Sequence, residues 1–141
     1  MKLRVFIDTN VFIYAFEFQN SNSAKVIELL NEGEIEATIS EQVLKEVTRY
    51  FEKFHSTILS KKFRRYLFDN CVIVKKEELN LQITDLKGKI KEKDIEQLAA
   101  TKKYGIKFLI SYDRDFEGFE EYVTPKQFLR TLNKEVSESE F

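Results

Sequence analysis

The sequence contains very little cysteine, proline or glycine, and these shortages limit the classes of protein that it can encode. A single cysteine, Cys71, cannot form a disulfide within the chain, and no CxxC or Cys/His spacing typical of a zinc site occurs. One proline and four glycines, with no Ser- or Gly-rich linker and no internal repeat, argue against a domain boundary. We therefore expect one domain over residues 1–132 and a frayed polar tail over residues 133–141.

The chain also lacks an excess of one charge and a long apolar run. Its 23 Lys and Arg residues oppose 24 Asp and Glu residues, so no overall basic field marks a nucleic-acid-binding protein. The apolar run between Arg4 and Asp8 is too short for a signal peptide or a membrane span. We expect a soluble cytoplasmic protein with no membrane partner.

Short apolar or β-branched runs alternate with helical patterns along the chain. The expected strands are residues 3–7, 36–40, 71–74, 107–111 and 122–124. Apolar residues recur at helical spacing before Gly33, after Ser40 and before Gly105. Strands joined by helix-length connections predict right-handed crossovers and a parallel sheet that helices cover on both faces. We therefore predict the α/β class, as a three-layer α/β/α sandwich.

Polar residues appear at the ends of two expected strands, where ligands bind in open parallel sheets. They are Asp8, Thr9 and Asn10 after strand 3–7, and Ser111, Asp113 and Asp115 at the end of strand 107–111. The chain has 18 Glu but only 6 Asp, so the Asp residues at these strand ends are unusual within this sequence. The pattern predicts a ligand site at the carboxyl edge of the sheet.

Two further acids are candidates for the same edge. At about 100° per residue, Glu46 lies beside the apolar stripe of the helix that follows Ser40, so it borders the core. Asp94 begins the helix that leads into strand 107–111, and simple geometry puts the start of that helix at the opposite edge. Asp94 reaches the carboxyl edge only if the chain breaks near Gly88 and sends a second helix back.

Each of these residues also has a purely structural explanation, and none is decisive alone. The alternatives are helix capping by Asp8 and Asn10, a capping box of Asp94 with Gln97, pairing of Glu46 with Arg49 or Tyr50, and an Asx-turn at Asp113. Considered together, clustered carboxylates without a nearby Lys or His repel one another and persist mainly around a cation. An all-oxygen set selects Mg²⁺ or Mn²⁺ over Zn²⁺, and such an ion can activate a water molecule. The lone His55 lies away from these acids.

Four segments stand in a distinctive order along the chain: VFIDTNVFIYAF, SEQVLKEV, KDIEQLAATKKYGIKFLISYDRDF and YVTPKQFL. In order and spacing they resemble the successive motifs of the PIN domain, a metal-dependent ribonuclease fold. The resemblance implies that Asp8, Glu46, Asp94 and Asp113 bind one or two Mg²⁺ or Mn²⁺ ions and are the catalytic residues. It matches Asn10 and Ser111 to polar helper positions, and Thr9 and Asp115 are further accessory candidates.

The same resemblance implies a fold and an activity. It implies a five-stranded parallel sheet in the order 3-2-1-4-5, a helix bearing Asp94 that folds back, and hydrolysis of RNA phosphodiester bonds that leaves 5′-phosphate and 3′-hydroxyl ends. Many small members of the family are toxins, so we also expect an antitoxin partner and a homodimer or higher oligomer. Two features depart from the pattern: Ile95 is bulkier than the residue often found there, and residues 51–90 match no specific motif.

A basic segment from Lys53 to Phe68 offers a surface for an RNA backbone. It holds five Lys or Arg residues and no acid, interleaved with aromatic residues. The candidate RNA-binding residues are Lys53, Lys61, Lys62, Arg64 and Arg65. The alternative is a solvated helix face whose aromatic residues are buried in the core, which we favour for the aromatic residues.

Other functions fit the sequence less well. A phosphatase of the haloacid-dehalogenase type needs D-x-D after its first strand, where this chain has Asn10 in place of the second Asp. A nucleotide-binding module is disfavoured because neither GxGxxG nor GxxxxGK occurs. The remaining alternative is an RNA-processing protein, or a non-catalytic PIN-like domain that binds RNA or protein.

Overall fold

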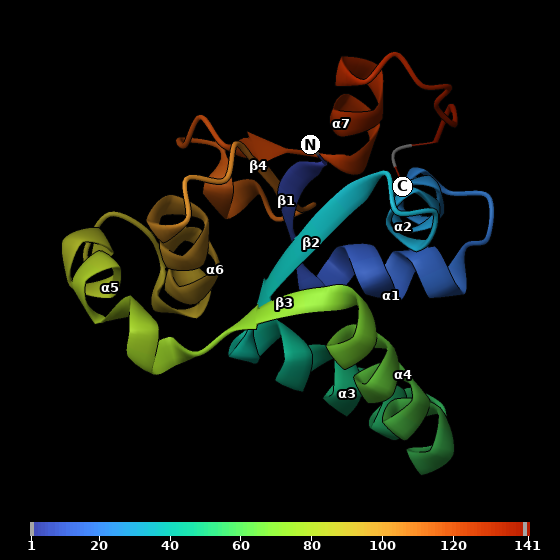
Figure 1. Ribbon diagram of the computed structural model, residues 1–141, viewed down its shortest axis with the longest axis horizontal. Coiled ribbons are helices and arrows are strands. Elements are labelled where there is room, and N and C mark those ends of the chain that lie inside the picture. Colours follow the sequence, from blue (N-terminus) through green and yellow to red (C-terminus); the bar gives the residue numbers. More distant parts are fainter. Residues whose placement is uncertain (1, 140) are drawn as a thin grey trace.

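A central parallel sheet organises the computed structural model, which describes residues 2–139 and residue 141 (Figure 1). The strands are β1 (Leu3–Ile7), β2 (Ile35–Ser40), β3 (Cys71–Val74), β4 (Phe108–Ile110) and β5 (Tyr122–Val123). Each neighbouring pair is parallel, and the order across the sheet is β3-β2-β1-β4-β5. The predicted sheet and its order are therefore confirmed, and no observed strand end differs from the predicted one by more than one residue.

Helices cover both faces of this sheet. They are α1 (Thr9–Glu17), α2 (Asn22–Asn31), α3 (Glu41–Phe54), α4 (Thr57–Asn70), α5 (Asn80–Leu86), α6 (Glu92–Lys103) and α7 (Pro125–Thr131), with short 3-10 turns at Lys76–Leu79 and Arg114–Phe116. The connections from β1 to β2 and from β2 to β3 put α1 to α4 on one face, whereas the connection from β3 to β4 puts α5 and α6 on the other (Figure 1). Within the described residues, no helix combines the length and apolar composition that a bilayer crossing requires.

Local sequence explains where these elements begin. Ser21, Ser40 and Ser56 stand just before α2, α3 and α4, and each side chain accepts a hydrogen bond from a backbone N–H of the first turn. The last three residues of β1 are fully buried, as expected for a central strand with helices on both faces. The carboxyl end of β1, which leads directly into Asp8, is therefore held firmly by the core.

The helix that carries Asp94 returns to the carboxyl edge because the chain reverses at Gly88. Gly88 has a φ of 82°, a backbone conformation that glycine adopts without steric penalty. It separates α5 from α6, and Asp94 lies in the first turn of α6. The break that the sequence analysis required near Gly88 is present, and it brings Asp94 to the same cavity as Asp8.

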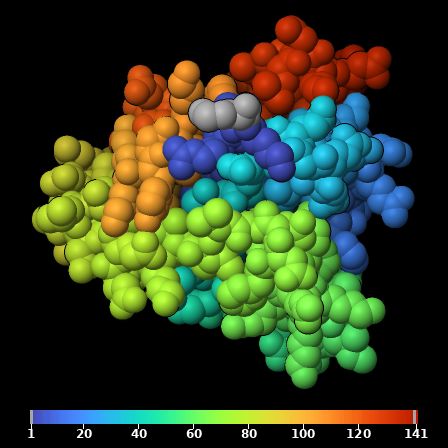
Figure 2. Space-filling model, in the orientation of Figure 1, coloured from blue at the N-terminus to red at the C-terminus, as the bar shows by residue number. Residues whose placement is uncertain are grey.

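Described residues of the C-terminal segment form hydrogen bonds with the start of α2. The side chain of Asn22 accepts a hydrogen bond from the backbone N–H of Ser137 at 2.7 Å and donates one to the carbonyl of Ser139 at 3.1 Å. The carbonyl of Phe141 accepts from the backbone N–H of Ser23 at 3.0 Å. Figure 2 shows this segment (red) resting beside the segment of α2 (light blue). Polar groups of this predicted tail therefore have hydrogen-bond partners on α2.

Candidate metal centre

A cavity of about 420 Å³ opens at the carboxyl edge of the sheet, beside the boundary between β1 and β4 where the direction of the crossovers reverses. Its lining includes all four predicted acids, which are Asp8, Glu46, Asp94 and Asp113. They come from the ends of β1 and β4 and from α3 and α6. Its other lining residues are Thr9, Asn10, Ile13, Arg49, Tyr50, Lys53, Phe54, Lys93 and Gln97.

Asp8 both caps a helix and lines the cavity. One of its side-chain oxygens accepts a hydrogen bond from the backbone N–H of Thr9 at 2.8 Å, as the N-cap of α1. The other accepts from the hydroxyl of Ser111 at 2.6 Å. Asp8 is 4% exposed, and this burial raises the pKa of its carboxyl group despite the two hydrogen bonds. The capping explanation of Asp8 is therefore correct, but it does not exclude a functional role.

Ser111 connects three of the predicted residues. Its hydroxyl donates to Asp8, accepts from the backbone N–H of Asp113 at 2.9 Å, and lies 3.4 Å from the side-chain nitrogen of Asn10. The side-chain oxygen of Asn10 accepts from the backbone N–H of Tyr112 at 3.3 Å. These contacts join the ends of β1 and β4, so Ser111 and Asn10 fix the relative positions of the two loops that carry Asp8 and Asp113.

Glu46 forms hydrogen bonds with Thr9 and Gln42, and not with the Arg49 or Tyr50 of the alternative explanation. Its two carboxylate oxygens accept from the hydroxyl of Thr9 at 2.6 Å and from the side-chain amide of Gln42 at 3.3 Å. The proposed pairing with Arg49 or Tyr50 is therefore wrong. Thr9 follows Asp8 directly, so the hydrogen bond from Thr9 places the Glu46 carboxylate beside the end of β1.

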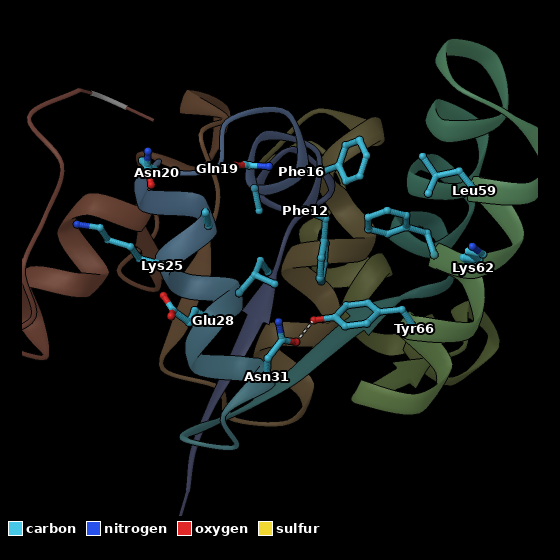
Figure 3. A pocket seen from close by; sticks show the side chains of 14 residues that line it. Phe12, Phe16, Gln19, Asn20, Lys25, Glu28, Asn31, Leu59, Lys62 and Tyr66 are labelled. Carbon is cyan, nitrogen blue, oxygen red and sulfur yellow. Dashed lines mark hydrogen bonds between the residues drawn. The ribbon is translucent and has the colours of Figure 1, made fainter.

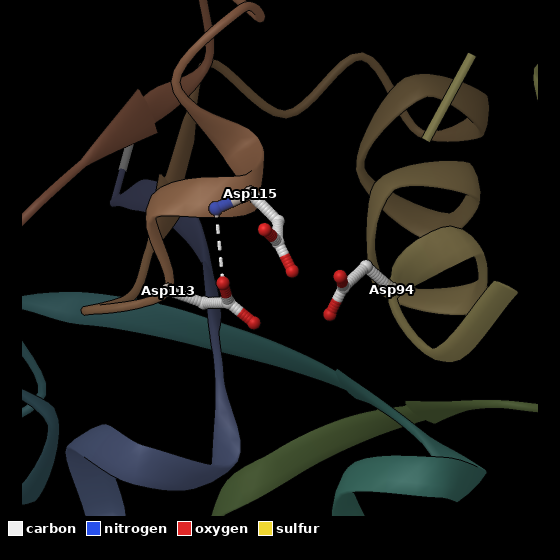
Figure 4. Close-up of side chains that lie close together, drawn as sticks. All are labelled: Asp94, Asp113 and Asp115. Carbon is white, nitrogen blue, oxygen red and sulfur yellow. Dashed lines mark hydrogen bonds between the residues drawn. The ribbon is translucent and has the colours of Figure 1, made fainter. Parts of the chain in front are cut away.

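Asp94, Asp113 and Asp115 form a compact group of carboxylates, which we call the aspartate triad (Figure 4). One side-chain oxygen from each lies within 4.8 Å of those of the other two. Asp113 accepts a hydrogen bond from the backbone N–H of Asp115 at 2.9 Å, so the Asx-turn that was the structural alternative for Asp113 is present. Asp94 does not cap its helix, because the N-cap of α6 is Lys91.

Lys93 lies among these carboxylates, and the sequence analysis did not identify it. Its Nζ is 3.2 Å from Asp94 Oδ1, 2.9 Å from Asp113 Oδ2 and 3.2 Å from Asp115 Oδ2. These hydrogen bonds, that to Asp113 foremost, raise the pKa of the Lys93 ammonium, and the contact with Lys93 lowers the pKa of Asp115 to about 2. The assumption that no lysine lies near the acids is therefore wrong.

The donor set fits a hard divalent cation. All the side chains of the aspartate triad offer carboxylate oxygens, the ligands that Mg²⁺ and Mn²⁺ prefer. Asp94 is only 2% exposed, and its Oδ2 has no hydrogen-bond partner among the described residues. A buried carboxylate oxygen without a partner is costly, and burial raises the pKa of Asp94 to about 7. This oxygen is therefore available to bind a cation.

The predicted basic residues fall into two groups. Lys53 lines the acidic cavity, together with Arg49, which the sequence analysis did not propose for RNA binding. The other four line a separate hollow on α4 beside Phe68; they are Lys61, Lys62, Arg64 and Arg65. His55 pairs with Glu17 at 3.2 Å and does not line the cavity, as expected. Basic charge next to the acids is thus supplied by α3 and α6.

A second, larger cavity of about 700 Å³ lies between α1, α2 and α4, and we call it the apolar groove (Figure 3). Phe12, Phe16, Leu59 and Phe63 contribute apolar side chains to its lining. The hydroxyl of Tyr66 on α4 donates to Asn31 Oδ1 on α2 at one end of the groove. Phe16 keeps 38% of its surface exposed, so the groove presents apolar area to solvent.

Known proteins resemble this chain in sequence and in fold. The family model described as PIN domain matches residues 4–115. A toxin-antitoxin complex from Klebsiella pneumoniae is similar with a TM-score of 0.68 and 22% identity, over 86% of this chain and 97% of that chain. DNA-bound VapBC from Salmonella typhimurium is similar with a TM-score of 0.69 and 13% identity, over 87% and 98%.

A further similar structure is VapC20 of Mycobacterium tuberculosis, a toxin that cleaves the sarcin-ricin loop. Its TM-score is 0.58 at 16% identity, over 81% of this chain and 93% of that chain. At these identities the likeness concerns the fold. No curated protein matches the sequence.

Proposed function

The chain belongs to the PIN domain family, and we propose that it is a metal-dependent endoribonuclease whose active site is the cavity lined by Asp8, Glu46, Asp94 and Asp113. The observation that carries the proposal is that these four acids line one cavity at the carboxyl edge of the sheet, where a buried oxygen of Asp94 has no hydrogen-bond partner in the part of the chain that the structure describes. Carboxylates held this close repel one another, and the single positive charge of Lys93 offsets only part of the charge of the three aspartates, so the arrangement favours a site that a divalent cation completes.

In this proposal the aspartate triad would hold Mg²⁺ or Mn²⁺, and Asp8 and Glu46 line the same cavity as Asp94 and Asp113. When bound, such an ion supplies positive charge that stabilises phosphoryl oxygens and lowers the pKa of a water molecule. Ser111 and Thr9 keep the carboxylates of Asp8 and Glu46 in fixed orientations, as outer partners of metal ligands do.

RNA would enter over the basic side of the same cavity. Arg49 and Lys53 lie on α3, as does Glu46, and all three line the cavity. Their positive charges offset the repulsion between an acidic site and a phosphate backbone, and Phe54, 61% exposed at the end of the same helix, offers a surface on which a base can stack. A part of the RNA farther from the cleaved bond is predicted to bind to Lys61, Lys62, Arg64 and Arg65.

The test is cleavage of a labelled single-stranded RNA with and without Mn²⁺. We expect cleavage that EDTA abolishes, products with 5′-phosphate ends, and no cleavage by Asp8→Asn. Asn is also a good N-cap, so this substitution should leave α1 and the fold intact, which circular dichroism can check. The matched control is Asp69→Asn, an exposed aspartate on α4 paired with Arg65, which should cleave like the unmodified protein.

Metal-independent cleavage, or full cleavage by Asp8→Asn, would contradict the proposed active site. A protein that binds RNA but never cleaves it would instead support the alternative of a non-catalytic PIN-like domain. Cleavage of defined precursor transcripts without toxicity to cells would support the alternative of an RNA-processing enzyme.

We further propose that the protein is a toxin whose antitoxin partner covers the apolar groove with an apolar segment. The proposal is supported by the similarity to toxin-antitoxin complexes and by the exposed apolar lining of the groove. Lys25 and Lys62 at the groove suit an acidic flank on that segment, although Glu28 also lines it. The predicted homodimer or higher oligomer remains a separate prediction, to be measured by light scattering.

Growth of cells that express the chain tests this role. We expect growth arrest that co-expression of the small protein from the adjacent gene relieves. Leu59→Asp, in the groove, should keep the toxicity but lose this relief, because a charge there opposes an apolar segment. Ile58→Asp is the matched control, since Ile58 is the neighbouring residue, is 71% exposed and does not line the groove. Relief of both variants alike, or assembly of the chain with itself through the groove, would contradict the proposal.

A further inference from the structure

We propose that Lys93 is an internal counter-ion that occupies the aspartate triad when no metal is bound and competes with the divalent cation for it. This inference rests on the proposed function, because it assumes that the triad is a metal site. It concerns the regulation of that site: the chain carries its own cation, and the ammonium of Lys93 must leave before the triad can be filled.

The geometry of Lys93 is that of a bound cation. Its ammonium has three N–H donors, and three carboxylate oxygens, one from each member of the triad, lie 2.9 to 3.2 Å from it. These are distances of charge-assisted hydrogen bonds or close ion pairs. One residue thus satisfies in part the charges of three acids that come from α6 and from the loop after β4.

The same oxygens cannot serve the ammonium and a divalent ion at once. Mg²⁺ binds oxygen at about 2.0–2.1 Å, so an ion among these oxygens would take the place of Nζ and repel its positive charge. Lys93 also leaves one oxygen of the triad unused, since it contacts Oδ1 of Asp94 while the buried Oδ2 has no hydrogen-bond partner within residues 2–139 and 141. The triad therefore retains unused capacity for a cation with more coordination positions than an ammonium has.

Lys93 is free to move out. Its side chain is 59% exposed, and it projects from the first turn of α6 on a flexible four-carbon stem. Asp94, by contrast, is buried and fixed on the same turn. Displacement therefore requires the movement of one surface side chain and leaves the backbone and the ligands in place. Because Lys93 pairs with all three carboxylates, the triad keeps its arrangement without metal. Because the cation must displace Lys93, the triad binds the cation less tightly than it would without this lysine.

Mn²⁺ binding measured by isothermal titration calorimetry, without RNA, tests the competition. We expect Lys93→Met to bind Mn²⁺ about tenfold more tightly than the unmodified chain, because the competing cation is gone. The matched control is Lys91→Met. Among the described ion pairs the Lys91 ammonium meets one member of the triad, Asp115, at 3.3 Å, so its loss removes the same unit of charge from the same region and should change the affinity less than threefold.

A second measurement requires no substitution. Amine acetylation followed by mass spectrometry should label Lys93 slowly in the metal-free chain and faster after Mg²⁺ is added, whereas labelling of Lys91 should change little.

Lys93→Gln should reproduce the tighter Mn²⁺ binding of Lys93→Met, and this variant replaces Lys93→Met if the methionine variant does not fold.

The outcomes separate the two proposals. If the unmodified chain and both Lys93 variants bind Mn²⁺ with equal affinity, or if labelling of Lys93 does not respond to Mg²⁺, the counter-ion proposal is wrong while the metal site stands. Weaker binding by the Lys93 variants also overturns it, because Lys93 would then assist the metal. If no form of the chain binds Mn²⁺ at millimolar concentration, the proposed metal-dependent function itself fails.

Discussion

Replacing Asp94 with Asn should stabilise the metal-free protein while abolishing its function. Asp94 is 2% exposed, one of its oxygens lacks a partner, and burial raises the pKa of its carboxyl group to about 7. In the unfolded chain the pKa of Asp is about 3.9. At pH 8 this difference corresponds to about 4 kcal/mol of lost folding free energy. Water screens the share that comes from the partly exposed Asp115, and Asn also gives up the ion pair with Lys93, so we expect Asp94→Asn to gain about 2 kcal/mol.

The difference in stability between the unmodified protein and Asp94→Asn should depend on pH. Between about pH 4 and pH 7 the folded state holds a proton on Asp94 that the unfolded state has released, so the stability of the unmodified protein falls as pH rises through this range. Asp94→Asn lacks this loss. The gap between the two proteins should therefore be present at pH 8, as a rise in melting temperature of about 6 °C, and should shrink to about 2 °C at pH 5.

The assay is thermal unfolding followed by circular dichroism in EDTA at pH 5 and pH 8, with RNA cleavage measured separately in Mn²⁺. The control is Asp85→Asn, an exposed aspartate of α5, which should change the unfolding free energy by less than about 0.5 kcal/mol at either pH. Cleavage by Asp94→Asn should fall at least about 100-fold, the effect of losing about 3 kcal/mol of transition-state stabilisation. An Asp94→Asn protein that is less stable at pH 8, or a gap equal at both pH values, would refute the reasoning.

Three further substitutions test other parts of the structure. Ser111→Ala removes the donor to Asp8, so Mn²⁺ affinity measured by calorimetry should drop about 10- to 100-fold. Phe51→Ala empties a fully buried site where the ring stacks on Phe63 at 3.9 Å, and urea unfolding should show a loss of about 3–5 kcal/mol. Lys53→Gln should raise the KM for RNA severalfold and reduce the slope of log affinity against log salt by about 1; if Lys61→Gln has the larger effect, RNA follows α4 and avoids the cavity.

Residues that depend on local patterns could be predicted from the sequence. The apolar run of β1 and the start of α3 after Ser40 are short-range features, and each lies close to its predicted position. Asp8, Asn10, Ser111 and Asp113 follow because the carboxyl ends of parallel strands meet at one edge. Their catalytic roles remain predictions, although the structure brings the side chains together.

Partners that lie far apart along the chain could not be predicted. A lysine beside an aspartate in the first turn of a helix is typical of a solvent-exposed face, so Lys93 was missed. Its partners Asp113 and Asp115 are 20 or more positions away. Likewise, Glu46 was assigned neighbours on its own helix, whereas its hydroxyl partner Thr9 lies 37 positions earlier.

The sequence by itself determined the class of the fold, the strands and the identity of the acids, because hydrophobic periodicity, caps and strand-end polarity act over a few residues. Only the tertiary structure decided that Asp94 is buried with an oxygen that has no partner among the described residues, and that Lys93 lies between three carboxylates. These features depend on how separate elements pack. The energies that govern the site, which are the burial of a charge and its distance from other charges, exist only once the chain has folded.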